Sequence, residues 1–148
     1  SRPARGLAIG AWVAWNDAEL AEDLPPGPAF GRDGDQLPNS SRWSGSLSFD
    51  QELSLSARAS AFLGGTVSYV GERKGNFQAT AARQTFPAYT QVDLRTNLRV
   101  DTWSLNLFAN NVTDRRGVLR GGLDAVVFPS YFTYIQPRTI GVSFSKSF

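Results

Sequence analysis

Apolar and small polar residues alternate with a period of two along much of this chain, and no helical period recurs. In a strand, side chains two positions apart point to the same side. The last thirteen residues, 136–148, place Ile140, Val142, Phe144 and Phe148 on one side and mainly Thr, Gly and Ser on the other. The pattern predicts a strand here, with one apolar and one polar face.

The same alternation predicts six strands in all. They cover about 6–16, 43–50, 54–70, 91–100, 103–110 and 136–148. Because proline cannot donate a hydrogen bond to a neighbouring strand, its positions test this assignment. All eight prolines fall outside the strand interiors, at positions 3, 25, 26, 28, 38, 87, 129 and 137.

The connections between these strands are unequal. Tight turns are expected at 50–52 and 101–102, whereas the links 17–42, 71–88 and 112–135 are long and rich in Gly, Pro and charge. Short turns at one end and long loops at the other are typical of outer-membrane β-barrels. The edge strand of a soluble β-sandwich also alternates, so that fold remains an alternative.

Aromatic residues on the apolar face gather at the expected strand ends. Trp15, Trp43, Tyr69 and Tyr134 lie at the long-loop ends, and Phe49, Trp103 and Phe148 lie at the short-turn ends. Two aromatic belts suit the two interfaces of a membrane, whereas a packed core has no reason to sort rings to strand ends. Tyr89 falls on the polar face and fits only if a bulge shifts the phase. The predicted fold is an all-β, antiparallel up-and-down transmembrane β-barrel segment of about six strands, an incomplete barrel.

Composition removes several classes of function. The chain has no Cys and no His, so thiol catalysis, a Ser-His-Asp triad and Cys- or His-ligated metals are unavailable. The net charge of +2 is too small to indicate nucleic-acid binding. The acidic residues of 17–42 match no calcium-loop spacing. We expect no enzymatic activity, no cofactor and no bound metal.

Five segments carry a family resemblance: 10–20, 37–43, 87–95, Leu107-Phe-Ala-Asn-Asn-Val-Thr-Asp-Arg-Arg116, and the tail 136–148. In this order they resemble the C-terminal part of a TonB-dependent outer-membrane receptor. Two positions depart from the family pattern. Gly117 stands where an aromatic residue usually follows the basic pair, and Lys146 stands at an apolar-face position, from which its amine can reach the headgroups.

The resemblance implies an active-transport receptor in the bacterial outer membrane that takes up a ferric siderophore or a similar scarce nutrient. Such receptors hold a plug inside a barrel of about 22 strands and take energy from the TonB complex through a short N-terminal box. The chain is one domain, has no Met and begins with Ser1, so residues 1–148 are expected to be the receptor's C-terminal piece, without plug and N-terminal strands. Several copies forming an outer-membrane pore or adhesin are the alternative, because about eight strands are needed to close the smallest barrel.

The long loops differ in charge, with net values of -4 for 17–42, +2 for 71–88 and +1 for 112–135. Because arginine pairs well with carboxylate and catecholate oxygens, Arg83, Arg116 and Arg120, with Tyr131, are candidates to attract an anionic metal chelate. The loop charges can instead pair with one another or with lipopolysaccharide. By resemblance, Ile140, Val142, Phe144 and Phe148 would form the signal that the barrel-assembly machinery reads, or Phe148 is simply an interface anchor.

Overall fold

The computed structural model describes residues 1–27, 30–77, 83–124 and 128–148. Within these ranges the regular structure is entirely strand, and no helix is long and apolar enough to cross a membrane. The strands are β1 (Leu7–Trp15), β2 (Trp43–Ser56), β3 (Ala59–Val70), β4 (Arg73–Lys74), β5 (Thr85–Phe86), β6 (Tyr89–Val100), β7 (Trp103–Asn110), β8 (Val118–Asp124), β9 (Phe128–Tyr134) and β10 (Thr139–Lys146).

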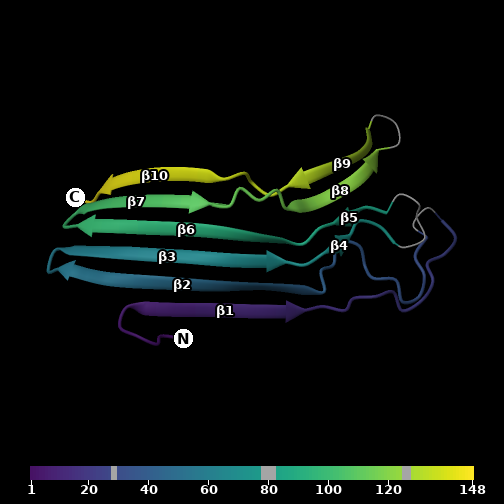
Figure 1. Ribbon diagram of the computed structural model, residues 1–148, viewed down its shortest axis with the longest axis horizontal. Coiled ribbons are helices and arrows are strands. Elements are labelled where there is room, and N and C mark those ends of the chain that lie inside the picture. The colour runs from purple at the N-terminus through teal and green to yellow at the C-terminus, as the bar shows by residue number, and fades with distance from the viewer. Residues whose placement is uncertain (28–29, 78–82, 125–127) are drawn as a thin grey trace.

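Six of these strands form one antiparallel sheet in the order β1-β2-β3-β6-β7-β10 (Figure 1). Two-residue turns at 57–58 and 101–102 lie at one end of the sheet, and the long connections lie at the other. Those connections contain two small hairpins, β4–β5 and β8–β9. In the described parts of the chain, β1 and β10 are the free edges of an open sheet. The predicted all-β, antiparallel, unclosed six-strand fold is therefore confirmed.

The strand register sorts the side chains onto two faces. One row, for example, joins Phe49 to Gly65, Gly65 to Leu94, Leu94 to Ala109 and Ala109 to Ile140. All such rows on this side, here called the apolar face, carry a single charged residue, Lys146. The opposite side, the polar face, carries Asp50, Glu52, Asp93, Arg95 and Arg99 among Ser, Thr and Asn residues.

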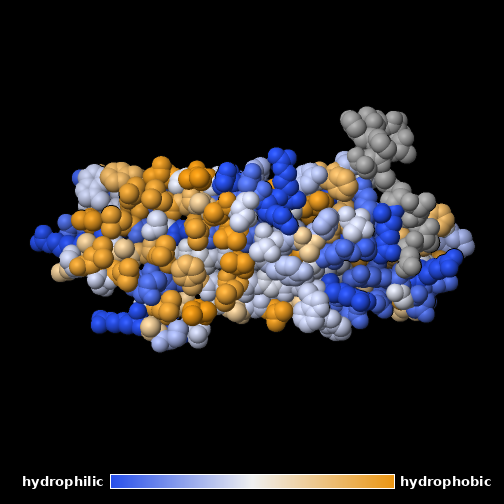
Figure 2. Space-filling model, viewed as in Figure 1, coloured by the Kyte–Doolittle hydropathy of each residue, from blue (hydrophilic) through white to orange (hydrophobic). Residues whose placement is uncertain are grey.

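Within the described residues, no protein core lies against the apolar face of the sheet. The buried hydrophobic residues of the described chain are Phe86, Val118 and Ile135, and all three lie outside the six-stranded sheet. The accessible surface is 10318 Å², whereas a compact monomer of this mass exposes about 7,400 Å². On the side seen in Figure 2, hydrophobic residues gather over the sheet and hydrophilic ones over the long connections. The described residues thus supply no second layer of the kind a soluble sandwich needs.

Strand β2 is longer than predicted, and the turn expected at 50–52 is wrong. The strand continues to Ser56, and Gln51 pairs with Leu63 inside the sheet. One of the polar residues that resembled a turn forms an ion pair with another strand instead. Asp50 Oδ1 lies 2.7 Å from Arg95 Nη2 on the polar face. Gly64 lies between them, and a Cβ there would approach the Asp50 oxygen to 2.5 Å. A glycine in β3 therefore allows β2 and β6 to form an ion pair over it.

This longer strand also corrects the position of Phe49. The residue lies in the middle of β2, opposite Ile9 and Gly65, and not at the short-turn end. Tyr134, expected at the start of the last strand of the sheet, lies instead in the β8–β9 hairpin, paired with Val118. Trp15 and Trp43 pair with each other at the long-loop end, and Tyr69 lies one residue before the end of β3.

The short-turn end carries an aromatic cluster around Lys146. The rings of Trp103 and Phe144 stack with their centroids 4.8 Å apart. The Lys146 amine lies 4.7 Å from the Trp103 ring centroid and 5.1 Å from that of Phe148. Cation–π attraction of this kind accommodates a lysine at an aromatic rim. The one charge on the apolar face therefore lies at its end, among rings.

Candidate functional site

The connections at the long-loop end are organised around Arg73 of β4. This side chain is only 8% exposed and donates hydrogen bonds to the carbonyl oxygens of Val118 and Leu119, the latter at 2.9 Å. Its guanidinium carbon lies 5.8 Å from the ring centroids of both Phe86 and Tyr89. Because a buried cation is costly unless it is paired or hydrogen-bonded, these contacts explain how Arg73 is tolerated there, although its Nε has no hydrogen-bond partner in the described chain.

Further contacts join the β4–β5 hairpin to the β8–β9 hairpin. Phe86 is fully buried and meets Phe132 edge to face, with centroids 6.2 Å apart. The Gln84 amide donates to the carbonyl oxygen of Gly122 at 3.2 Å. Together with the Arg73 contacts, these interactions make the two hairpins a single packed unit, here called the loop core.

Tyr89 and Gly117 both departed from the expected pattern, and in the structure they lie against each other. Strands β3 and β6 pair without a register shift, so Tyr89 lies on the polar face and no bulge moves it. Its ring covers Gly117, where a Cβ would come within 2.5 Å of the ring. Any larger residue at 117 would collide with Tyr89. The ring of Tyr89, at the start of β6, therefore fills the space that a side chain at position 117 would need.

The segment 107–116, which carried much of the family resemblance, contains the end of β7 and a turn built on Asn111. Asn111 is fully buried with a φ of +50°. Its side-chain amide donates to the carbonyls of Arg115 and Gln136, both at 2.9 Å, and its Oδ1 accepts from the Arg115 N–H at 2.9 Å. Its own N–H donates to Asp93 Oδ1 at 2.8 Å. This motif joins β6, the end of β7 and the start of β10.

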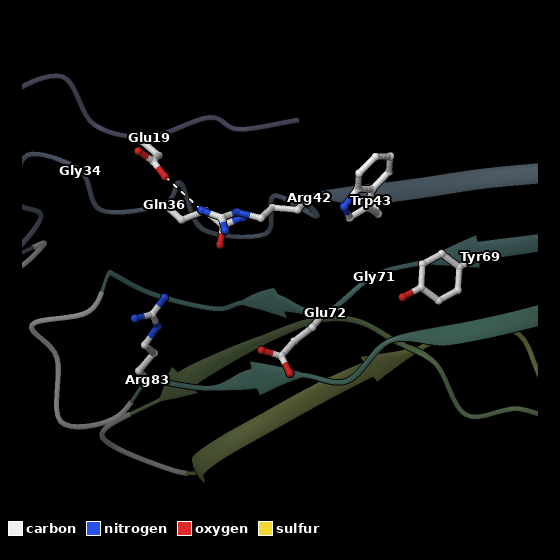
Figure 3. A pocket seen from close by; sticks show the side chains of 9 residues that line it. All are labelled: Glu19, Gly34, Gln36, Arg42, Trp43, Tyr69, Gly71, Glu72 and Arg83. Carbon is white, nitrogen blue, oxygen red and sulfur yellow. Dashed lines mark hydrogen bonds and ion pairs between the residues drawn. The ribbon is translucent and has the colours of Figure 1, made fainter. Parts of the chain in front are cut away.

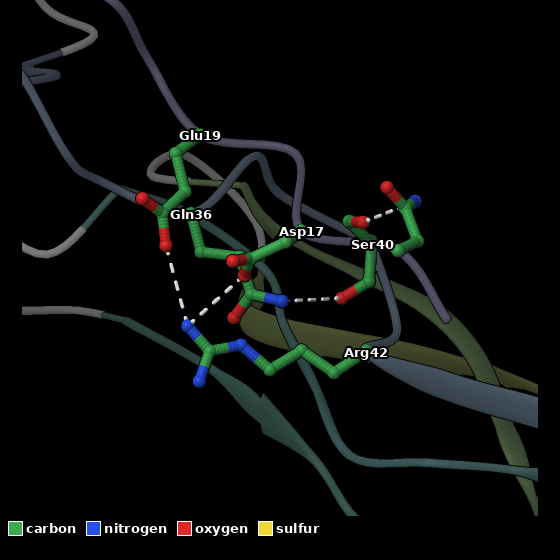
Figure 4. A network of polar contacts seen from close by, with 6 residues as sticks. Asp17, Glu19, Gln36, Ser40 and Arg42 are labelled. Atoms are coloured by element: carbon green, nitrogen blue, oxygen red, sulfur yellow. Dashed lines mark hydrogen bonds and ion pairs between the residues drawn. The ribbon is translucent and has the colours of Figure 1, made fainter.

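The first long connection, 16–42, is held by a network around Arg42 (Figure 4). Arg42 Nη2 lies 3.2 Å from both Asp17 Oδ1 and Glu19 Oε1. The Gln36 amide donates to the Ser40 carbonyl at 3.3 Å. These ion pairs are partly exposed, so each contributes about 1 kcal/mol or less. They nevertheless neutralise Arg42 inside its own loop.

A cavity of about 440 Å³ lies between this loop and the connection from β3 to β6 (Figure 3). Its lining consists of Glu19, Gly34, Gln36, Arg42, Trp43, Tyr69, Gly71, Glu72 and Arg83. Arg42 and Arg83 reach it from opposite loops. Glu72 lies 2.5 Å from Lys74 Nζ, whereas the buried Arg83 Nε has no hydrogen-bond partner among the described residues.

The four predicted ligand contacts divide into two locations. Arg83 lines the cavity, and Arg116, Arg120 and Tyr131 do not. Arg120 pairs with Thr133 and Gly122 pairs with Tyr131, so Arg120 and Tyr131 share one face of the β8–β9 hairpin. Both are exposed, and so is Arg116, just before β8. The structure therefore groups Arg120 with Tyr131 and separates them from Arg83.

Sequence reasoning did not select Arg42, Arg73 or Asn111 as organisers of this end. Arg73 stands beside Lys74 in a charged run, which resembles a solvated surface. Only the burial of Arg73 and its contacts with β8 reveal its role. Among the described residues, no group of three or more His, Cys, Asp or Glu side chains could hold a metal ion.

An open sheet with one face almost free of charge and long connections at one end is the wall of a transmembrane β-barrel. Residues 5–112 match the family model described as TonB dependent receptor-like, beta-barrel, and the chain belongs to this family. The expected family is thereby confirmed. Its members are outer-membrane transport receptors and not enzymes. No curated protein and no solved structure matched the chain.

Proposed function

We propose that residues 1–148 form the C-terminal part of the barrel wall of a receptor that takes up a ferric siderophore or a similarly scarce nutrient. The observation that carries this proposal is the open sheet whose apolar face has no protein layer over it in the described residues. Each unpaired backbone group at a strand edge in lipid costs several kcal/mol. The free edges of β1 and β10 are therefore completed by the other strands of the receptor, which also encloses the plug and contacts the TonB complex through its N-terminal part.

The last strand has a second role in this proposal. β10 is an edge strand, and Ile140, Val142 and Phe144 are 75%, 67% and 65% exposed. Phe148 follows it and is fully exposed. An unpaired strand edge is a template for another chain. These four residues form the signal for the barrel-assembly machinery before the barrel closes.

The hairpin that carries Arg120 and Tyr131 attracts the anionic chelate. Both side chains are exposed on the same hairpin face, and Arg116 lies just before it. Arginine forms bidentate, charge-assisted hydrogen bonds with the carboxylate or catecholate oxygens of such ligands. The loop core supports this hairpin from its other side, where Phe132 meets Phe86.

Replacing Arg116 and Arg120 together by alanine in the full receptor is expected to weaken binding of the ferric chelate about a hundredfold or more. The reason is the loss of charge-assisted hydrogen bonds, each contributing roughly 1.5–3 kcal/mol. Equilibrium binding of the radiolabelled chelate to cells measures the effect. The control is Arg58→Ala, because Arg58 lies in the turn at the opposite end of the sheet. Unchanged affinity in the double variant would remove these arginines from the site.

A further inference from the structure

The cavity beside Arg83 lies at the outward edge of the wall. Two of its lining residues, Trp43 and Tyr69, belong to the apolar face at the long-loop end and are 54% and 43% exposed. Amphipathic rings at strand ends lie at the level of the lipid headgroups. The cavity continues from these rings into the loops, where Figure 3 shows Arg83 and Arg42. It is therefore open to the headgroup layer next to the barrel.

The charged side chains that line the cavity sum to zero, but they are not evenly paired. Arg42 is neutralised by Asp17 and Glu19, and Glu72 is neutralised by Lys74. No carboxylate of the described residues pairs with Arg83. Its Nε is buried and has no hydrogen-bond partner in the described chain. The Arg83 guanidinium is therefore left without an ion-pair partner among the described residues and with an unused donor, and an anion would supply both contacts.

We propose that this cavity binds a phosphate group of an outer-leaflet lipid headgroup, with Arg83 as its main contact. Arginine suits phosphate because its planar group donates two parallel hydrogen bonds. The volume of about 440 Å³ admits a phosphate with an attached sugar. Trp43 and Tyr69 then contact the apolar side of the same lipid. This inference rests on the proposed function, because it takes the long-loop end to be the outer side of the membrane.

The contact also gives Arg83 a role different from that of the chelate-binding arginines. Arg120 and Tyr131 lie on the β8–β9 hairpin and do not line the cavity. Gln84, the neighbour of Arg83, is bonded to Gly122 of that hairpin. A lipid held by Arg83 would therefore stabilise the loop core from the membrane side without occupying the nutrient site.

The test is lipid binding by the purified full receptor in detergent micelles, measured by native mass spectrometry. The probes are a diphosphorylated lipid A glycolipid, the same glycolipid without phosphates, and inorganic phosphate. We expect the phosphorylated lipid to bind, Arg83→Ala to weaken its binding about tenfold, and Arg83→Lys to weaken it less. The matched control, Arg120→Ala, should bind the lipid as the unchanged receptor does. The dephosphorylated lipid should bind no better to the unchanged receptor than to Arg83→Ala.

Two outcomes would overturn the inference. One is equal affinity of Arg83→Ala and the unchanged receptor for the phosphorylated lipid. The other is saturation of the site by inorganic phosphate at the same concentration as the lipid, which would make it a site for a soluble anion. Nutrient uptake by cells carrying Arg83→Ala separates this inference from the proposed function. Lost lipid binding with normal uptake supports the lipid site alone, whereas normal lipid binding with lost uptake contradicts it and assigns Arg83 to the nutrient.

Discussion

Replacing Asn111 by alanine is expected to destabilise the folded barrel by about 3 kcal/mol. The change removes three side-chain hydrogen bonds at a fully buried position and leaves the Arg115 N–H and two carbonyls without those partners. Each such loss costs roughly 1–3 kcal/mol where water cannot replace the bond. Alanine is also disfavoured at the positive φ of +50°. Equilibrium unfolding by urea in phospholipid vesicles measures the change.

Two variants separate the causes of this loss. Asn111→Gly keeps the backbone freedom and removes only the hydrogen bonds, so it should recover about 1 kcal/mol relative to alanine. Asn110→Ala changes the adjacent, exposed asparagine of β7 and should cost less than about 0.5 kcal/mol. An Asn111→Ala variant as stable as Asn110→Ala would show that the turn does not depend on the Asn111 side chain.

Placing a charge at the centre of the apolar face is expected to have an effect of similar size. Leu94 lies near the middle of β6, between Gly65 and Ala109 of the neighbouring strands. Arginine on the lipid-facing side of a barrel costs about 2–4 kcal/mol at the bilayer midplane. Leu94→Arg should therefore lower the unfolding free energy in vesicles by that amount.

The matched variant on the other face is Thr66→Arg. Thr66 lies one row away on the polar face, paired with Ser48 and Asp93. A cation introduced there would meet water and the carboxylate of Asp93. It should cost less than about 1 kcal/mol. Equal losses for the two variants would mean that the two faces do not meet different solvents, and the barrel-wall assignment would fail.

The features that could be predicted from the sequence are those that depend on alternation. A period of two specified the two faces, because side-chain direction in a strand follows position alone. The β2–β3 turn was predicted from polar residues and not from alternation, and that prediction was wrong. The true turn at 57–58 consists of Ala57 and Arg58, which are not typical turn residues, while the polar run 50–52 imitated one.

The parts that could not be predicted depend on contacts between distant segments. Asp50 stays in its strand because Arg95 reaches it over Gly64, and this pair joins strands far apart in sequence. Tyr89 fits the polar face only because Gly117 leaves room for its ring. The cavity joins Arg83 to a loop more than forty positions earlier in the chain. No local pattern contains such information.

β7 offers a direct test of which solvent meets each face. Trp103, Leu105, Leu107 and Ala109 lie on the apolar face, whereas Ser104, Asn106 and Phe108 lie on the polar face. Phe108 is the informative position, because it is apolar by type but packs over Gly141 on the polar side. A label at position 108 therefore tests whether the strand register, and not the hydropathy of the residue type, decides which solvent the position meets.

The decisive measurement is a scan of single nitroxide labels at positions 104–109 in the receptor reconstituted in bilayers. Collision with oxygen reports hydrocarbon, and collision with a water-soluble nickel chelate reports water. Labels at 105, 107 and 109 should favour oxygen, and labels at 104, 106 and 108 should favour nickel. Loss of this alternation, or a label at 108 that behaves like its neighbours at 107 and 109, would contradict a lipid-facing apolar side.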